Sequence, residues 1–460
     1  MKTSPSLGSR LRAGLKRPPH TFALFFATSL GARAIGIGCQ LLQVALVVKT
    51  LGTESFGLWM TMTSVTSLVL FADLGLGIGA QNRVAEHLAR GETTEARTLF
   101  ATVFVMLAGI GVTLAIVLTP VVAHLDFAAL FRLHTPSTVA QATGAALALC
   151  WVFCAGFPFA LAQRLAFARQ EGWTYNVAQA GGNVLSLALV AYGAHAGWGL
   201  GSLVASSQGA LVVSNAVLLA VQLWQLRWLD PRRLGVRLSL LREMAQLGAF
   251  FSVQQILATV LFSLPQVIIS ATLGAAAVTP YNLVQRLFNL FAIVQNAFML
   301  PLWPAYSQAK ARQEFDWMRR TLRRSVHATA LCCVAPMVAS ACVAPQIIHF
   351  WVGTGDAQPG ALLIWLLCAW NALAFFQQPY TYLLVGVSEI RRTTLYSVLS
   401  ALVSTALMYG LARPFGAPGV ALGLILGYLP FNFIGNLVET RRYLRTAPTV
   451  TAAAAPVPAA

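Results

Sequence analysis

The amino-acid sequence predicts an all-α integral membrane protein with about twelve transmembrane helices in two six-helix halves. The chain has 460 residues, of which 57% are hydrophobic and only 10% are charged, and its mean hydropathy is +0.69. A soluble domain carries about 25% charged residues. Apolar segments of about 20 residues, the length that spans a bilayer, recur along the whole chain. The composition therefore excludes a soluble globular domain.

Twelve segments are long and apolar enough to cross a membrane. Each one ends where charged or turn-forming residues interrupt the apolar run. An even number of spans places both termini on the same side. The predicted spans are 22–48, 56–80, 99–122, 139–162, 174–193, 199–224, 247–272, 280–303, 326–350, 360–386, 394–412 and 418–438.

The net charge of +17 follows this topology. The side that holds both termini carries 26 of the 31 Lys and Arg residues, whereas the opposite side carries only Lys49, Arg132 and Arg413. Short cytoplasmic loops of membrane proteins are enriched in these two residue types. The sequence thus predicts cytoplasmic N and C termini, contact with anionic membrane lipids, and no nucleic-acid partner.

The longest basic connector near the middle of the chain predicts the boundary between the halves. Residues 1–21 form a basic cytoplasmic tail, 22–225 the N-terminal half, and 226–246 a cytoplasmic linker. Residues 247–440 form the C-terminal half, and 441–460 a cytoplasmic tail whose Ala- and Pro-rich composition predicts disorder.

A weak internal repeat also indicates two related halves. Thr50–Gly52, which reads Thr-Leu-Gly, recurs as Thr272–Gly274, and we align Phe56–Trp59 with Tyr281–Val284. Halves with an even number of spans have the same orientation, so the repeat axis is parallel to the membrane normal. Substrates of transporters built in this way bind between the halves.

Arg33 lies inside the first span, where a charged side chain is costly and usually functional. It shares one helical face with Gln40 and Gln43, at offsets of 7 and 10 residues. This face predicts contact with protein or a wet cavity. A structural ion pair with Asp73 of the second span is the alternative.

The span 280–303 carries a stripe of polar residues at offsets 0, 3, 4, 7 and 14, which fall within about 100° of the helix surface. Lipid cannot be the neighbour of such a stripe. A packed polar interface and a watered cavity both fit it. Its members are Asn282, Gln285, Arg286, Asn289 and Asn296.

Three other amides and one acid are candidate functional groups. Asn176 and Gln179 share a face of the span 174–193, and Gln255 lies in the span 247–272. Hydrogen bonding between helices and contact with a substrate are both open for these amides. Asp73 either has a functional role inside its span or reaches the nearer membrane interface.

The stretch 56–97 resembles the second transmembrane helix and first cytoplasmic loop of bacterial polysaccharide-transport proteins. These are the oligosaccharide flippases of the multidrug/oligosaccharidyl-lipid/polysaccharide (MOP) exporter superfamily. The match rests on Phe56–Trp59 (FGLW), Phe71–Gly77 (FADLGLG) and the pair Asn82-Arg83. The resemblance implies a MATE-like fold in the bacterial inner membrane and a substrate linked to a polyprenyl diphosphate.

A net positive cavity between the halves would suit that anionic substrate. Arg33 and Arg286 would bind phosphate oxygens, while the amides would bind sugar hydroxyls during alternating access. Asp73 is the candidate for ion pairing or for coupling to protons or sodium. No catalytic residue, metal site or cofactor is predicted. The expected partners are the lipid-linked sugar, membrane lipids, and polysaccharide polymerase and export machinery.

Three alternatives remain. A cation-coupled exporter of small molecules would favour an acidic cavity. A membrane-embedded sugar polymerase or ligase would need catalytic groups in a sizeable external loop. A scaffold without transport activity would tolerate neutral residues at Arg33 and Arg286.

Overall fold

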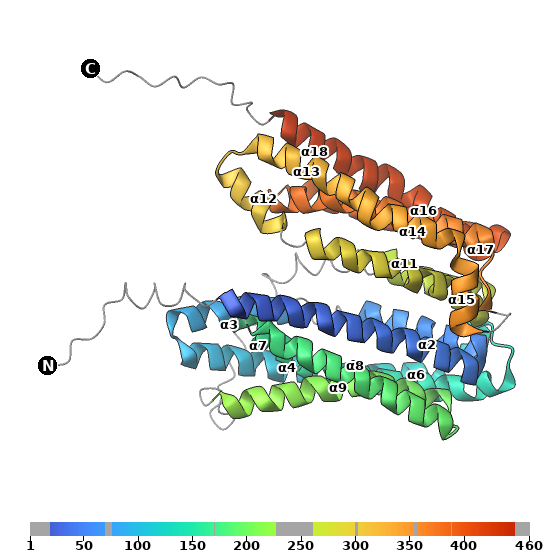
Figure 1. Ribbon diagram of the computed structural model, residues 1–460. Coiled ribbons are helices and arrows are strands. Elements are labelled where there is room, and N and C mark those ends of the chain that lie inside the picture. The colour runs from blue at the N-terminus through green and yellow to red at the C-terminus, as the bar shows by residue number, and fades with distance from the viewer. Residues whose placement is uncertain are drawn as a thin grey trace, which may run out of the picture. The chain divides into compact units, whose positions relative to one another are not determined.

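The computed structural model describes residues 19–69, 76–169, 171–226, 261–299, 302–353, 357–387 and 389–446. These residues form long helices joined by short connections, and they contain no β-strand (Figure 1). The α-helices are α2 (Pro19–Val69), α3 (Leu76–Arg90), α4 (Thr93–His124), α5 (Phe127–Phe131), α6 (Pro136–Phe159), α7 (Leu161–Ala168), α8 (Gly172–His195), α9 (Leu200–Gln225), α11 (Val278–Met299), α12 (Leu302–Ala311), α13 (Phe315–Thr329), α14 (Ala335–Cys342), α15 (Ala344–Val352), α16 (Ala361–Gly386), α17 (Ile390–Tyr428) and α18 (Gly435–Thr446).

Eight helical segments in the described part of the chain are long and apolar enough to cross a membrane. Two of them contain a non-helical glycine, Gly52 in α2 and Gly416 in α17, and each therefore covers two predicted spans. The shorter apolar helix Leu261–Leu273 and α11 overlap two more. Every predicted span thus overlaps a described helix, and the all-α membrane fold is confirmed.

The connectors are more helical than the sequence predicted. The stretch 307–324, which lies between the predicted spans 280–303 and 326–350, belongs largely to α12 and α13, and a turn at Gln313 with φ 57° separates these two helices. The helix α18 continues to Thr446, so residues 441–446 of the predicted disordered tail are helical. Helix α3 extends ten residues beyond the predicted span 56–80 and ends at Arg90, just before Gly91. The predicted linker 226–246 lies outside the described residues, apart from Leu226.

The chain forms two compact units, each of which is discontinuous in sequence. Unit 1 comprises Met1–Thr50, Leu70–Leu125 and Gln141–Ser252, and unit 2 comprises Leu51–Val69, Asp126–Ala140 and Val253–Ala460. The bend at Gly52 is therefore the place where α2 passes from unit 1 to unit 2. The two halves predicted from the sequence remain a prediction.

Unit 1 has a core between α3, α4, α7 and α9. The apolar faces of these helices interlock around fully buried leucines, which the hydrophobic effect stabilises by about 2 kcal/mol per side chain. Helices α8 and α9 form an antiparallel pair joined by residues 196–199. The core includes Val84, Leu99, Val103, Leu161, Leu165 and Leu219.

Unit 2 contains a tight helical hairpin within α17. Gly416 adopts φ 67° and ψ −151°, which a residue with a side chain rarely tolerates, and it reverses the chain just before Pro418. The two halves of the hairpin then pack so closely that an added Cβ would meet backbone or a serine at less than 3.0 Å. The close positions are Gly419, Gly423 and Gly427. Small residues allow such close helix packing in membranes.

The internal repeat is visible in the backbone of two glycines. Gly52 has φ 82° and ψ 173°, and Gly274 has φ 96° and ψ 159°. These values lie in a region that only glycine populates readily, so the Thr-Leu-Gly match reflects a shared local structure. The two glycines are 222 residues apart.

The same offset relates two contacts in unit 2. The Thr279 hydroxyl donates a hydrogen bond to the Thr53 carbonyl at 2.6 Å, and Gly57 packs against the Ala275 carbonyl. An offset of 222 residues converts Thr53 into Ala275 and Gly57 into Thr279, so the two contacts exchange under the repeat. The predicted alignment of Phe56–Trp59 used an offset of 225 and is wrong by three residues.

Candidate functional site

Arg286 of α11 is half-buried in unit 2 and is held by neutral groups. Its Nε donates a hydrogen bond to Asn282 Oδ1 at 2.8 Å, one helical turn earlier. Its Nη2 donates to Met60 Sδ at 3.3 Å, and Met60 belongs to the second part of α2. Thioether sulfur is a weak acceptor. Among the described residues no carboxylate forms an ion pair with Arg286, so its charge is not compensated there.

Two of the four amides of the predicted stripe bind the neighbouring helix α16. Gln285 and Asn371 form a reciprocal amide pair, with N···O distances of 3.1 and 3.2 Å. Further along, Gln378 Nε2 donates to Asn296 Oδ1 at 3.3 Å. These bonds hold α11 and α16 in register, so the packed interface accounts for this part of the stripe.

One member of the stripe remains open. Asn289 is exposed, and its Oδ1 accepts a hydrogen bond from Gln285 Nε2 at 3.2 Å. Its amide nitrogen has no partner among the described residues. Arg286 and Asn289 are three positions apart and therefore neighbours on the surface of α11. They leave a guanidinium group and an amide available on one side of this helix.

In unit 1, Arg33 and Gln40 lie on the same exposed face of α2. Neither makes a hydrogen bond or ion pair with any residue that the structure describes. Gln43 is different, because its Nε2 donates to Ser207 Oγ of α9 at 2.7 Å, and Ser186 of α8 donates to the same hydroxyl at 3.1 Å. The Ser207 hydroxyl thus joins three helices through Gln43 and Ser186, while Arg33 and Gln40 are free to bind a ligand.

The amides of α8 face the first part of α2. Asn176 Nδ2 donates weakly to Thr28 Oγ1 at 3.4 Å. The carbonyl of Gln179 accepts from Asn183 Nδ2 at 2.9 Å. A Cβ added at Gly36 would lie 3.1 Å from that same Asn183 nitrogen. Helix packing is therefore the role that these contacts support for this face of α8.

Two predicted groups, Asp73 and Gln255, lie outside the described residues. Two partners of the stripe, Met60 and Asn371, were not predicted from the sequence. Asn371 and Gln378 are seven residues apart on a mainly apolar helix, so they share one face, and this spacing is a signal that predicts a partner for the stripe. Met60 offered none, because a methionine in a membrane span is indistinguishable from other apolar residues.

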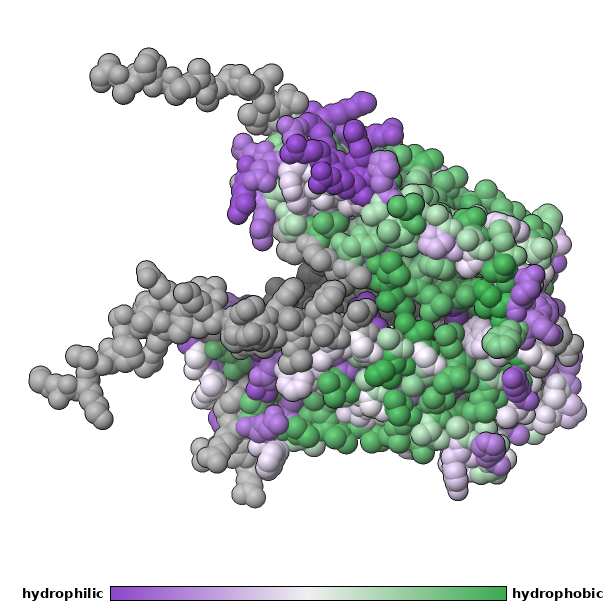
Figure 2. Space-filling view, in the orientation of Figure 1, coloured by the Kyte–Doolittle hydropathy of each residue, from purple (hydrophilic) through white to green (hydrophobic). Residues whose placement is uncertain are grey.

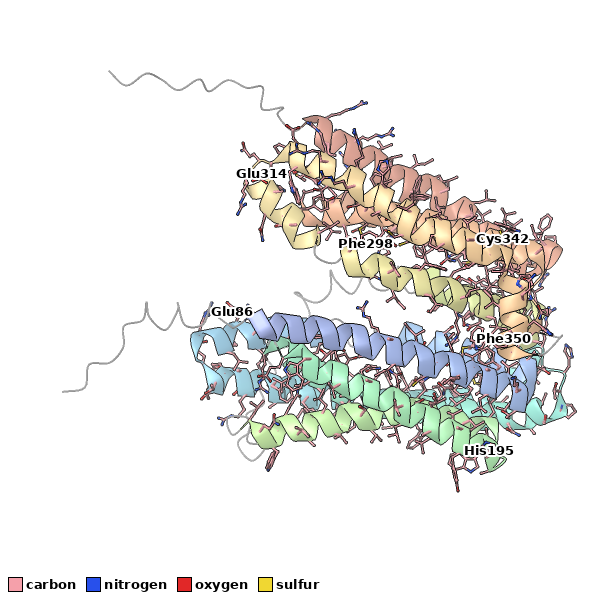
Figure 3. The ribbon with its side chains drawn as sticks, viewed as in Figure 1. Glu86, His195, Phe298, Glu314, Cys342 and Phe350 are labelled. Atoms are coloured by element: carbon pink, nitrogen blue, oxygen red, sulfur yellow. The ribbon has the colours of Figure 1, made fainter. Side chains whose placement is uncertain are left out.

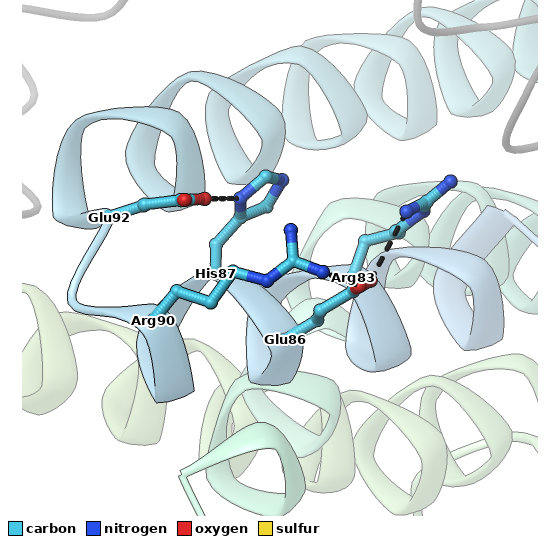
Figure 4. A network of polar contacts seen from close by, with 5 residues as sticks. All are labelled: Arg83, Glu86, His87, Arg90 and Glu92. Atoms are coloured by element: carbon cyan, nitrogen blue, oxygen red, sulfur yellow. Dashed lines mark hydrogen bonds and ion pairs between the residues drawn. The ribbon is translucent and has the colours of Figure 1, made fainter. Parts of the chain in front are cut away.

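Arg83, which belongs to the Asn82-Arg83 pair that carries the family resemblance, takes part in a network of charged side chains at the end of α3 (Figure 4). Glu86 accepts hydrogen bonds from Arg83 Nη1 at 3.1 Å and from Arg90 Nη2 at 2.5 Å. His87 Nδ1 lies 2.7 Å from Glu92 Oε2. Exposed pairs of this kind contribute less than about 1 kcal/mol each, so the network orders the connector between α3 and α4 and adds little stability.

Comparison with known proteins places these observations in a family. The family model described as polysaccharide biosynthesis protein matches residues 26–310, and a second model, MatE, matches residues 251–410. The chain is 19% identical over 435 residues to a proposed O-antigen export protein of Yersinia pseudotuberculosis, covering 92% of this chain and 98% of that protein. It is 20% identical to a proposed O-antigen transporter of Salmonella typhi, with 87% and 92% covered.

Two solved structures have the same fold. One is an inward-facing multidrug resistance MATE family transporter of the MOP superfamily, with a TM-score of 0.76, 14% identity, and 91% of this chain and all of that chain covered. The other is the lipid II flippase MurJ in an inward closed conformation, with a TM-score of 0.72, 13% identity, and 91% and 87% covered. Because its family model covers more than half of the sequence, the chain belongs to the polysaccharide biosynthesis protein family.

Proposed function

We propose that this protein flips a lipid-linked oligosaccharide across the bacterial inner membrane, with Arg286 binding the diphosphate of the lipid carrier. The observation that carries the proposal is the environment of Arg286, a half-buried guanidinium whose described partners are an amide oxygen and a thioether. A guanidinium stays charged in a low-dielectric site and matches phosphate oxygens in geometry. An anion would complete its hydrogen bonds and neutralise its charge.

Two further side chains are candidates for contact with the substrate. Asn289 beside Arg286 offers an amide to a sugar hydroxyl. Arg33 in unit 1 is a second cation without a described partner, and it would serve the same anionic headgroup at another stage of transport. The protein would act as a transporter and not as an enzyme, and a polymerase would then use the translocated unit.

Deletion of the gene from its own bacterium tests this function. We expect loss of a surface polysaccharide and accumulation of lipid-linked precursor that a glycosidase added outside the inner membrane cannot reach. Wild-type protein should restore the polymer. A polymerase or ligase defect would instead leave precursor accessible to the glycosidase, and that outcome would refute flipping.

A cation-coupled exporter of small molecules is the second candidate, and the MatE match over residues 251–410 favours it. The charge of the α11 surface opposes this function. A cationic drug would be repelled by Arg286, and no described acid forms an ion pair with Arg286 that would neutralise its charge. If the deletion strain became sensitive to cationic dyes while its membrane precursors stayed normal, the exporter function would replace flipping.

We also propose that both termini lie in the cytoplasm, a topology supported by the excess of Lys and Arg on one side. Green fluorescent protein fused after Thr446 should fluoresce, and alkaline phosphatase at the same place should be inactive. Phosphatase fused after Leu125, between α4 and α5, should be active. The reverse pattern at these two positions would invert the topology.

A further inference from the structure

Two neighbouring helices of unit 2 present five exposed arginines at one end. Arg320, Arg323 and Arg324 lie on α13, and Arg441 and Arg445 lie on α18. Within the described part of the chain, none of the five side chains has a carboxylate partner. We refer to these five residues as the arginine surface. In Figure 2 the hydrophilic residues of unit 2 gather at this end of α13 and α18.

Direct contacts fix the two helices side by side. Arg319 Nη2 donates a hydrogen bond to the Leu444 carbonyl at 2.6 Å, and the rings of Phe315 and Tyr443 lie 6.4 Å apart. Both Met318 and Leu444 are buried in the same core cluster. The first turns of α13 therefore lie beside the last turns of α18, so the arginines of the two helices form one surface.

The acids near this end are already engaged elsewhere. Asp316 pairs with Arg319 at 2.9 Å, and Glu439 pairs with Arg392 at 3.0 Å. Glu439 also lines a separate hollow, together with Leu384, Glu389, Arg392, Arg442 and Tyr443. That hollow carries as many acidic as basic side chains, whereas the arginine surface keeps an uncompensated positive charge.

After α13 the chain continues through a short π-helix, Ala330–Val334, in which Leu331 is exposed. Leu331 lies seven residues after Arg324, which places it on the same face and about 10 Å further along the axis. Its side chain is 76% exposed. The rod of α13 and α14 runs on from Glu314 to Cys342, as Figure 3 shows. Its outer face thus changes from cationic to apolar over about two turns.

Helix α18 also carries an exposed apolar side chain next to its arginines, but here the apolar residue comes first in the chain. Val438 is 52% exposed and precedes Arg441 by three residues and Arg445 by seven, so the three side chains share one face of α18. Because the two helices run in opposite directions, each places its exposed apolar group on the same side of its own arginines. The polar headgroup layer of a bilayer is several ångströms thick on each side of its hydrocarbon core. A boundary of this kind fits a headgroup layer, and an acidic soluble protein would not require the apolar half.

We propose that the arginine surface binds the phosphate groups of anionic phospholipids. The guanidinium groups would hold headgroup phosphates while Leu331 and Val438 contact the acyl chains. A headgroup with two phosphates could reach α13 and α18 together. Each basic residue near an anionic membrane strengthens binding about fivefold, so the loss of three should weaken it at least tenfold.

The test measures lipid binding to the full-length protein in detergent by native mass spectrometry, using cardiolipin, phosphatidylglycerol and phosphatidylcholine. The test variant combines Arg320→Gln, Arg324→Gln and Arg441→Gln. The matched control removes the same charge elsewhere, with Lys49→Gln, Arg132→Gln and Arg413→Gln. A third variant carries lysine at the three tested arginines, which keeps the charge. Binding of polyglutamate is measured in parallel.

We expect the wild type, the control and the lysine variant to retain cardiolipin and phosphatidylglycerol. The glutamine variant should bind these two lipids at least tenfold more weakly. Phosphatidylcholine should not distinguish the four proteins. Equal lipid retention by the glutamine variant and its control would overturn the proposal. If only polyglutamate binding were lost, an acidic protein partner would replace the lipid.

Discussion

Replacing Arg286 with Gln is expected to lower the rate of flipping to about 1% of the wild-type rate or less. Two hydrogen bonds between a guanidinium and a phosphate contribute about 3 kcal/mol or more, which corresponds to a factor of at least about 100. The measurement is the transfer of lipid-linked oligosaccharide in reconstituted vesicles, with equal amounts of inserted protein. Transport within twofold of the wild type would refute the role of Arg286.

The same variant should not unfold more easily. Among the described residues Arg286 forms no ion pair that the substitution would break, and burying its charge is costly. The neutral glutamine should therefore leave the free energy of unfolding unchanged or raise it. Arg286→Lys is the matched variant, because it keeps the charge but cannot keep the fork that reaches Asn282 and Met60 together. We expect it to transport about tenfold more slowly than the wild type. A fall in thermal stability that parallels the loss of transport would point to a structural role instead.

The sequence was sufficient to find the surface on which Arg286 lies, because helical spacing alone determines which residues of α11 are neighbours. The contact between Arg286 and Asn282, four residues apart, follows from that spacing. The partners on other helices could not be found in this way. Met60 is 226 residues away from Arg286, and its place depends on how the second part of α2 packs against α11.

The repeat shows the same limit. The Thr-Leu-Gly match was found because both glycines need an unusual backbone conformation, which restricts the residue type. Beyond Gly52 and Gly274 the two segments share little chemistry, and the aromatic residues Phe56 and Tyr281 suggested an offset that the contacts do not follow. A sequence pattern determines how the two repeats align only where the backbone conformation restricts the residue type. Elsewhere the alignment depends on how the helices pack.

The contact at Gly57 leads to the second prediction. A Cβ at this position would lie 2.7 Å from the Ala275 carbonyl carbon and closer still to its oxygen, and 3.3 Å from the Thr279 hydroxyl oxygen. Backbone cannot give way as a flexible side chain does, so the start of α11 must separate from α2. Gly57→Val should therefore lower the free energy of unfolding by about 3 kcal/mol. For unit 2, which has about 240 residues, this corresponds to a Tm roughly 6 to 12 °C lower.

Thermal unfolding in detergent, followed by tryptophan fluorescence, measures this effect. Gly109→Ala is the matched control, because Gly109 also lies in a helix and has no atom within 4 Å of an added Cβ. That change should leave Tm unaltered or slightly raised, since alanine favours helix over glycine. Thr279→Val removes only the hydrogen bond to Thr53 and should cost about 1 kcal/mol. Equal Tm values for Gly57→Val and Gly109→Ala would mean that the segments related by the repeat do not pack on one another, and the offset of 222 residues would lose its structural basis.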